Sequence, residues 1–342
     1  MKGKEKGAGA KGKKAEGEKG SETNPSSPLS LLTSPASRRP TVAVVGAGRL
    51  GTALAHALTS RGYEVTALVA QSPLHARRAA ALAGTPRSLA LGSAQLERLP
   101  PAGLLFITTP DDSVAGVAAR LAALGSPRVR GRVVLHTSGA LSSDVLAPLG
   151  EHGFHTGSMH PLVSVSDPLS GAERLGGGAF FCVEGDRAAA AAARRVVRDL
   201  GGQSFSVRAR DKARYHAAAV MTSGHAVALF DVALTELKLC GLAETRAREV
   251  LISLLRGTVE NLSAHTPERA LTGSFARADV ETVRAHLDAL LDGCDDEALM
   301  VYALLGNVSL RLAARRGTAD ASRLKEIARA LGRAFSGKGG KA

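Results

Sequence analysis

Residues 41–51 read Thr41-Val-Ala-Val-Val-Gly-Ala-Gly-Arg-Leu-Gly51, an apolar run that ends in three glycines spaced Gly46-x-Gly48-x-x-Gly51. A run of mostly small apolar residues follows, and then a second β-type run at 63–69. In such a turn one glycine makes the bend, the next lets backbone approach a pyrophosphate, and the third lets a helix pack closely on the strand. The pattern predicts a strand, a turn and a helix whose positive end binds the phosphates of a dinucleotide. A glycine-rich turn without a cofactor is the alternative.

The residues expected to contact the dinucleotide first are those of the turn and the start of the helix. They are Gly46, Ala47, Gly48, Arg49, Leu50 and Gly51.

The end of the second strand bears on the choice between NAD and NADP. An NAD-selective site places Asp or Glu about 20 residues beyond the last glycine, where it bonds the ribose hydroxyls. Here the sequence is Ala70-Gln71-Ser72, without a carboxylate to repel a 2′-phosphate. Gln71 and Ser72 offer hydrogen bonds, and Arg77 and Arg78 offer charge. We therefore expect NADP rather than NAD, the alternative being that the two arginines form a solvated helix face.

Composition limits the class of protein. The chain has 342 residues, 44% hydrophobic, 3% aromatic and no Trp, with a formal net charge of +13. Residues 1–40 hold nine Lys/Arg against four Glu, which is +5, so +8 remains for the rest of the chain. That charge forms no basic stripe interleaved with aromatic residues, and nucleic acid is not expected as the main partner.

The two ends of the chain differ in composition from its body. Residues 1–40 are rich in Lys, Gly and Glu and then in Ser and Pro, which predicts a disordered basic tail. Residues 336–342 predict a flexible end, because no strand precedes their Gly-Lys letters and no helix follows. The N-terminus has no apolar signal-like segment, and we find no apolar run long enough to cross a membrane.

Cysteine and histidine spacing argues against a metal site. Cys182, Cys240 and Cys294 are distant and odd in number, as in proteins of a reducing compartment. The histidines have no ligand-type spacing, so no metal is predicted. Together with the absence of a signal segment, this predicts a cytoplasmic protein.

Strand and helix patterns alternate along the first part of the chain. Strands are expected near 41–46, 63–69, 103–108, 131–136, 179–184 and 203–207. Such alternation predicts a doubly wound parallel sheet with helices on both faces, over residues 41–208. Residues 209–335 show helical patterns throughout, which predicts an all-α domain for substrate binding and dimerisation. Its first helix, about 211–239, is apolar nearly all round and should be buried, within its domain or at a dimer interface.

Polar loops follow the predicted strands at 103–108 and 131–136. In a doubly wound sheet ligands bind beyond the carboxyl ends of the strands. We expect Thr108, Thr109 and Pro110 to line the nicotinamide end, and Ser138 or His136 to face the substrate. Turn formation and helix capping are the alternative roles of these loops.

Three further side chains are candidates for the chemistry. His160 precedes a proline in Gly157-Ser-Met-His-Pro161 and can donate to a carbonyl or carboxylate. Lys212 and His216 lie four residues apart, hence on one helix face, where a partly dehydrated Lys can polarise a carbonyl or deliver a proton. The alternatives are a histidine that shapes a turn and a lysine on the surface. Thr272, Arg277 and Asp279, in a polar break between helices, are candidates for closing the site.

Five motifs together resemble a known family. Besides the glycine turn they are Leu135-His-Thr-Ser-Gly-Ala140, Gly157-Ser-Met-His-Pro-Leu162, Lys212-x-x-Tyr-His-Ala-Ala-Ala219 and Ala270-Leu-Thr-Gly273 followed by Arg277-x-Asp279. Over about residues 40–335 the chain resembles the bacterial Rossmann-like proteins with domain of unknown function 2520. That family is similar to the 6-phosphogluconate dehydrogenase-like reductases, including pyrroline-5-carboxylate and ketopantoate reductases. The Gly-x-x-His-Pro run is also similar to that of prephenate dehydrogenase.

The resemblance implies a Rossmann fold, an all-α C-terminal domain and a nicotinamide cofactor. Lys212 matches a substrate-site Lys of the wider group, while His216 stands where that group has Asn. The chain departs from the pattern at Ser223-Gly224, where Ser-Asn is expected, and at Thr272-Gly273-Ser274, where Thr-Gly-Pro is expected. We expect an NADP-dependent oxidoreductase, homodimeric, that moves a hydride to or from a small carbonyl or imine with a carboxylate. A non-catalytic NADP-binding module and hydride exchange with a deazaflavin are the alternatives.

Overall fold

The computed structural model describes residues 39–125, 132–293 and 296–336. The tail predicted at 1–40 lies outside the described residues except for its last two positions. Cys294 and all but the first residue of the predicted flexible end at 336–342 lie outside them as well. Residues from Pro40 onward form one unit by their contacts, so a domain boundary at 208/209 stays a prediction.

An eight-stranded sheet carries the first part of the chain, in the order β3-β2-β1-β4-β5-β6-β7-β8. All neighbours pair parallel except β6 and β7, which run antiparallel. This confirms the predicted doubly wound, mostly parallel sheet. The strands are β1 Val42–Val45, β2 Val65–Ala70, β3 Leu89–Gly92, β4 Leu104–Ile107, β5 Val133–His136, β6 His155–Pro161, β7 Phe180–Gly185 and β8 Gln203–Phe205.

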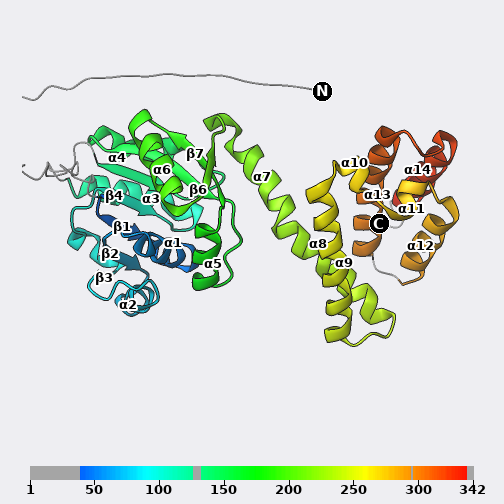
Figure 1. The fold of residues 1–342 in the computed structure, drawn as a ribbon, viewed down its shortest axis with the longest axis horizontal. Helices are drawn as coiled ribbons and strands as arrows, with labels where there is room; N and C mark the ends of the chain where they lie inside the picture. Colours follow the sequence, from blue (N-terminus) through cyan, green and yellow to red (C-terminus); the bar gives the residue numbers. More distant parts are fainter. Residues whose placement is uncertain (1–38, 126–131, 294–295, 337–342) are drawn as a thin grey trace, which may run out of the picture. The chain divides into compact units, whose positions relative to one another are not determined.

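Helices cover both faces of this sheet (Figure 1). They are α1 Arg49–Ser60, α2 Pro73–Leu82, α3 Asp111–Ala123, α4 Ala147–Glu151, α5 Pro168–Gly176 and α6 Arg187–Leu200, with 3₁₀ turns η1 Ser93–Arg98 and η2 Ser143–Leu146. The strand β1 is buried at all four positions, as expected for a central parallel strand with helices on both sides.

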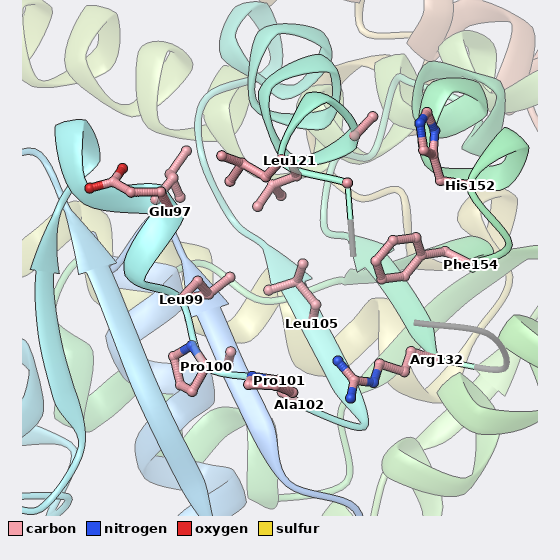
Figure 2. Close-up of a pocket in the computed structure, with 15 residues that line it drawn as sticks. Glu97, Leu99, Pro100, Pro101, Ala102, Leu105, Leu121, Arg132, His152 and Phe154 are labelled. Carbon is pink, nitrogen blue, oxygen red and sulfur yellow. The ribbon is translucent and has the colours of Figure 1, made fainter. Parts of the chain in front are cut away.

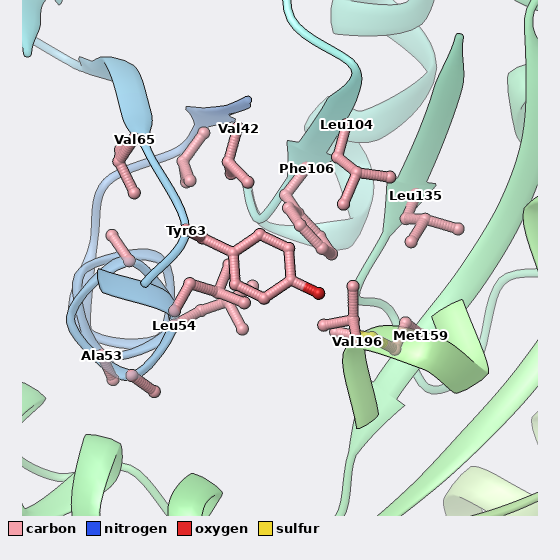
Figure 3. Close-up of a cluster of buried hydrophobic side chains, with 14 of the residues drawn as sticks. Val42, Ala53, Leu54, Tyr63, Val65, Leu104, Phe106, Leu135, Met159 and Val196 are labelled. Atoms are coloured by element: carbon pink, nitrogen blue, oxygen red, sulfur yellow. The ribbon is translucent and has the colours of Figure 1, made fainter. Parts of the chain in front are cut away.

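The core on one face is built from β-branched and aliphatic side chains under α1, α5 and α6. Figure 3 shows Phe106, Leu135 and Met159 from three neighbouring strands converging with Val196 of α6, and Tyr63 lies beside them. The Tyr63 hydroxyl donates to Asp199 at 2.6 Å, which satisfies the polar end of a nearly buried ring. This packing fixes β1, β4 and β5 side by side, so that their carboxyl ends meet at one edge.

The rest of the described chain is helical after the turn η3 Ala209–Asp211, as predicted. The helices are α7 Lys212–Thr222, α8 Gly224–Leu239, α9 Glu244–Ala264, α10 Pro267–Ala270, α11 Gly273–Arg277, α12 Val280–Asp292, α13 Asp296–Arg316 and α14 Ala321–Ser336. A separate apolar core joins α12, α13 and α14. Asp279 caps α12 by accepting from the Thr282 amide, and Ala278 before it has a positive φ of 52°.

The long apolar helix differs from its prediction in two ways. It is broken at Ser223, where α7 ends and α8 begins. It is also not buried within the chain, because α7 buries Lys212 alone and α8 buries none of its residues. Val227, for example, is 71% exposed. The expectation of burial within the domain was therefore wrong, and burial at a dimer interface stays a prediction.

Two helical stretches have a bearing on the expectation that no uninterrupted apolar run is long enough to cross a membrane. Two stretches, Ala209–Leu239 and Asp296–Arg316, are long and apolar enough to cross a membrane by length and composition. Neither stretch is an uninterrupted apolar run. Both have an apolar mean hydropathy, because Ala and Gly residues with few charged residues separate their larger apolar side chains. Near the amino end of the first stretch Lys212 donates to the Ser158 hydroxyl on β6 and to the Ser138 carbonyl, which fits a helix end that packs on protein.

Candidate functional site

The glycine turn after β1 is held in place by the strand beside it. Gly46 has a φ of 109°, and a Cβ there would lie 2.5 Å from the Thr109 backbone nitrogen. A Cβ on Gly51 would lie 2.3 Å from the Gly46 carbonyl oxygen. These two glycines are therefore required for the turn and for the close approach of α1. At Gly48, in contrast, the nearest atom to such a Cβ would be 3.9 Å away, which leaves the space a pyrophosphate would need.

The amino end of α1 fits an anion. Gly48 is its N-cap residue and supplies no side-chain hydrogen bond, and the first turn holds no acidic residue. The first backbone N–H groups of a helix lack partners within the helix, and the helix dipole adds positive potential there. A dinucleotide phosphate would satisfy these groups, so the residues present fit the predicted cofactor.

A cavity of about 790 Å³ adjoins this turn. Eight of the residues predicted for the cofactor line it: Gly46, Ala47, Gly48, Gln71, Arg78, Thr108, Thr109 and Pro110. The Thr109 hydroxyl oxygen is buried without a hydrogen-bond partner among the described residues, which a bound ligand would supply. The other five, Arg49, Leu50, Gly51, Ser72 and Arg77, are not part of the lining.

Basic residue types gather where the cavity passes the end of β2. His75, Arg78 and Arg120 line it there, and none of its lining residues in the described ranges is acidic. Arg120 donates to the Ser93 carbonyl at 3.0 Å, which ties α3 to η1. Arg77 instead lines a separate hollow beside β3. Ser72 caps α2 by accepting from the His75 amide.

A hydrogen-bonded cluster occupies the carboxyl ends of β4, β5 and β6. The Lys212 ammonium donates to the Ser158 hydroxyl over 2.7 Å and to the Ser138 carbonyl over 3.2 Å. The Ser138 hydroxyl donates to a carboxylate oxygen of Asp111 over 2.7 Å. Asp111 directly follows Pro110 of the cavity wall, so the cluster and the cavity share the turn after β4.

Three rings lie around the neighbouring Gly139. His160 Nδ1 is 2.7 Å from the Tyr215 hydroxyl, and the His160 ring meets those of Tyr215 and His216 edge-on. A Cβ on Gly139 would lie 2.2 Å from His216 Nδ1 and 2.9 Å from His160 Nε2. The absence of a side chain at this position is therefore what admits both histidine rings.

Burial lowers the pKa values of three basic side chains in this cluster. Lys212 is 1% exposed, and burial lowers its pKa although the charges of Glu184 and Asp111 raise it. Burial, with the charge of Lys212, lowers the pKa of His136 to about 4. Burial, with His216 and Lys212 close by, lowers the pKa of His160 to about 3. Both imidazoles are thus neutral at physiological pH.

The structure brings together the four side chains predicted for the chemistry, which are Ser138, His160, Lys212 and His216. The alternative of a surface lysine was wrong, because the Lys212 side chain is buried. Two partners that were not predicted as site residues are Ser158 and Tyr215. Ser158 lies two residues from His160 on β6, hence on the same side of the strand, and Tyr215 lies three from Lys212 on α7. That spacing along the strand and the helix was the sequence signal that could have identified Ser158 and Tyr215.

Other predicted features lie apart from this cluster. The part of the chain that the structure describes holds no group of three or more His, Cys, Asp or Glu placed to bind a metal ion. The Asp279 carboxylate accepts hydrogen bonds from Thr282 of its own helix, and a role of Thr272, Arg277 and Asp279 in closing the site stays a prediction. Figure 2 shows a second cavity, of about 340 Å³, near the amino ends of β4 and β5, lined by Leu105, Phe154 and other mainly apolar residues.

Comparison with known proteins gives the family and the fold. Residues 30–161 match a Rossmann-like domain, and residues 179–308 match the domain of unknown function 2520. This confirms the pairing that the motifs predicted. No curated protein matches the chain.

Solved structures share the fold over most of the chain. Protein TM1727 from Thermotoga maritima has 24% identity and a TM-score of 0.62, covering 80% of this chain and 99% of its own. BF3122 from Bacteroides fragilis, a proposed NADP oxidoreductase, has 21% identity and a TM-score of 0.61, covering 82% and 98%. A 1-pyrroline-5-carboxylate reductase from Streptococcus pyogenes has 13% identity and a TM-score of 0.51, covering 86% and 98%. At these identities the likeness shows the fold.

Proposed function

We propose that this chain, which combines a Rossmann-like domain with the domain of unknown function 2520, is an NADP-dependent oxidoreductase acting on a small carbonyl or imine substrate. The observation that carries the proposal is the shared turn after β4. There the wall of the cavity beside the glycine turn continues at Pro110 directly into the Asp111–Ser138–Lys212 cluster. A cofactor site and a buried polar cluster in contact at the carboxyl edge of a doubly wound sheet form the usual setting for hydride transfer.

The cofactor would be held by backbone and by two arginines. The turn from Gly46 to Gly48 and the α1 amino end would bind the pyrophosphate, and Thr109 would contact the nicotinamide end. Arg78 and Arg120 would face the adenosine side, where their charge suits a 2′-phosphate. When bound, the nicotinamide supplies or accepts the hydride.

The chain's own residues would orient the substrate and stabilise charge. Lys212 holds the ends of β5 and β6 together through Ser138 and Ser158, and its positive charge lies under the site. The rings of His160 and His216 lie beside Gly139, the residue after Ser138, where they would bond a carbonyl, an imine or a carboxylate. Fixed donors of this kind favour the transition state because they need no reorganisation during the reaction.

A second candidate is a cofactor-binding module without catalysis. Two observations favour it. Two of the three N–H donors of Lys212 already bond protein acceptors. Gly224, where the family pattern has Asn, has no side-chain amide to offer a ligand at the start of α8. Cofactor binding without turnover of any keto acid or imine would decide for this candidate.

We also propose a soluble cytoplasmic homodimer. Exposed large apolar side chains gather on helices of the C-terminal part, including Leu239 of α8, Leu254 and Val259 of α9, and Leu304 of α13. The 21-residue helix α9 buries only Ala247. Apolar surface that is left exposed on several helices marks an interaction site, and a second copy of the same helices is the matching apolar partner.

The test of the cofactor proposal is calorimetric titration with NADPH and, separately, NADH. We expect NADPH to bind at least tenfold more tightly, which corresponds to about 1.4 kcal/mol or more. Arg78→Ala should remove most of this preference. Arg77→Ala is the matched control, since its side chain lies in another hollow, and it should bind like the parent. A folded protein that binds neither nucleotide would overturn the proposal.

A further inference from the structure

We propose that His75 is a specificity-determining residue for the cofactor: its protonated imidazole pairs with the 2′-phosphate of NADPH, so that binding of NADPH takes up a proton. The inference rests on the proposed function and deepens it. It predicts a preference for NADPH over NADH that grows as pH falls, because histidine is the side chain that gains a proton between about pH 8 and pH 5.

One face of α2 forms part of the cavity wall. His75, Arg78, Ala79 and Leu82 line the cavity at positions i, i+3, i+4 and i+7, which share one side of a helix. Arg77 lies off this side and lines the hollow beside β3. His75 and Arg78 are therefore neighbours on the cavity wall, where both can reach one phosphate group.

The place of this pair in the fold fits the 2′-phosphate of the nucleotide. The pyrophosphate belongs at the glycine turn after β1, whereas the group that distinguishes NADP from NAD belongs beyond the end of the next strand in the chain, β2. That strand ends at Ala70, and Gln71, His75 and Arg78 follow it in the cavity wall. A phosphate bound there would meet two basic side chains from one helical turn.

The His75 ring has one nitrogen free for a ligand. Its Nδ1 lies 3.3 Å from the hydroxyl oxygen of Ser72, the N-cap residue of α2, and its Nε2 forms no hydrogen bond within the described part of the chain. A protonated imidazole donates from both nitrogens. It would therefore keep the contact with Ser72 and donate a charge-assisted hydrogen bond from Nε2 to a phosphate oxygen.

The charged and polar groups around His75 determine the sign of the pH effect. Arg78 lies on the same helix and Arg120 on α3, which also lines the cavity, while Gln71 and Ser93 add uncharged groups just after β2 and β3. No acidic residue lines the cavity in the described ranges, so its wall supplies no negative charge that would keep the imidazole protonated before the nucleotide binds. A phosphate dianion beside the ring favours the protonated form. NADPH would thus draw a proton onto His75, whereas NADH, which carries a hydroxyl in place of that phosphate, would not.

Proton uptake is measurable without turnover. Calorimetric titration of the full-length protein near pH 7, in PIPES, HEPES and Tris, gives the number of protons bound as the slope of the observed enthalpy against the ionisation enthalpy of the buffer. We expect NADPH to take up about half a proton more than NADH. The 2′-phosphate is mostly dianionic at this pH, so it contributes little to the uptake. Between about pH 8.5 and pH 6.5 the preference for NADPH should grow about three- to fivefold.

Two substitutions at this exposed position separate the charge of the side chain from its presence. His75→Gln should lower the preference for NADPH at about pH 6.5 and remove most of its pH dependence. His75→Lys should keep a preference for NADPH but lose the pH dependence, because a lysine stays charged throughout this range. His152→Gln, at an exposed histidine that lines the other cavity, is the control and should behave like the parent.

The outcomes separate this inference from the proposed function. Equal proton uptake with NADPH and NADH, or a pH dependence that survives in His75→Gln, would overturn the inference alone, since NADPH would still bind. Binding of neither nucleotide by the folded parent would overturn the proposed function together with it. The titrations of the parent decide the inference even where a variant does not fold.

Discussion

Lys212 shows how one residue can be read in two ways until its surroundings are known. As the first residue of a helix it has the sequence context of a surface lysine. In the structure its ammonium is buried and donates to two groups that lie 54 and 74 residues away in the chain. A cation without water is costly unless it is bonded, so its retention there points to a role beyond packing.

We predict that Lys212→Met lowers kcat/KM by a hundredfold or more while changing the free energy of unfolding by only about 1 kcal/mol. The methionine keeps the volume, and the loss of two hydrogen bonds is offset by removal of a buried charge. Steady-state kinetics and urea unfolding followed by far-UV circular dichroism measure the two effects. A loss of stability with activity retained would show that Lys212 is a structural residue.

His136 makes stability depend on pH. Its Nδ1 accepts from the Ser138 amide and its Nε2 lies 3.2 Å from the Ser142 carbonyl, an arrangement that only the neutral ring satisfies. The unfolded chain protonates this ring below pH 6.5, whereas the folded chain does so only near pH 4. The stability it contributes is therefore fully present above pH 6.5 and is lost as pH falls to about 4.

The predicted loss from His136 over this window is about 3 kcal/mol. It is measured as the difference in unfolding free energy between pH 7 and pH 4, in the parent and in His136→Gln. The variant should have the flatter profile. His152→Gln, which removes an exposed histidine, should keep the slope of the parent, and equal slopes in all three proteins would contradict the assignment.

At the scale of elements, the sequence predicts those strands, turns and helices that a short contiguous stretch of residues specifies. The unit β1–turn–α1 could be predicted because its apolar run and glycine spacing are contiguous, and Asp279 could be predicted as a cap for the same reason. The strand β3 was missed because its four residues carry a weak signal and lie at the sheet edge. For β6 the sequence predicts only an extended run leading to His160, because Gly157 and Pro161 weaken the strand pattern, and the neighbours β5 and β7 specify its full length.

The site was predictable in its members but not in its contacts. Ser138, His160, Lys212 and His216 carry chemistry that can be recognised in the sequence. The hydrogen bonds that join them span long sequence separations and depend on how α7 begins against the sheet. The sequence did not decide which of Arg77 and Arg78 lines the cavity, because one residue of helical rotation moves a side chain by about 100° and so to another face.

The exposed apolar face of α9 gives a prediction for the assembly. Leu254 is 69% exposed in the single chain, and we expect it to be buried between two copies. Leu254→Lys would place a charge in that interface and weaken dimerisation at least a hundredfold, about 3 kcal/mol. Light scattering at 10 μM, roughly mid-range for such interfaces, should give a monomer mass. Leu74→Lys, on α2 and 54% exposed, is the control and should stay dimeric.

At the scale of the whole molecule, the exposed apolar helices favour nonpolar surroundings, whereas the Rossmann sheet to which they are attached favours water. Ala209–Leu239 has the length and composition to enter a membrane, yet its amino end is held on the sheet by the contacts of Lys212 and Tyr215. The neighbouring helix α9 carries Arg246, Arg256 and Glu260, which a lipid phase would not accept without cost. A second copy of the chain, as proposed, would satisfy both demands, because it would cover the apolar side chains and leave the charged residues at a hydrated rim.

If two copies cover each other, stability must depend on protein concentration. Association stabilises the folded state by mass action, so each tenfold rise in concentration adds about 1.4 kcal/mol per dimer. For a dimer of this size that raises Tm by about 1 °C per tenfold, or about 3 °C over a thousandfold range. Scanning calorimetry and circular dichroism together span that range. A Tm independent of concentration, with the protein recovered on phosphatidylcholine vesicles in flotation, would instead assign the apolar face to lipid.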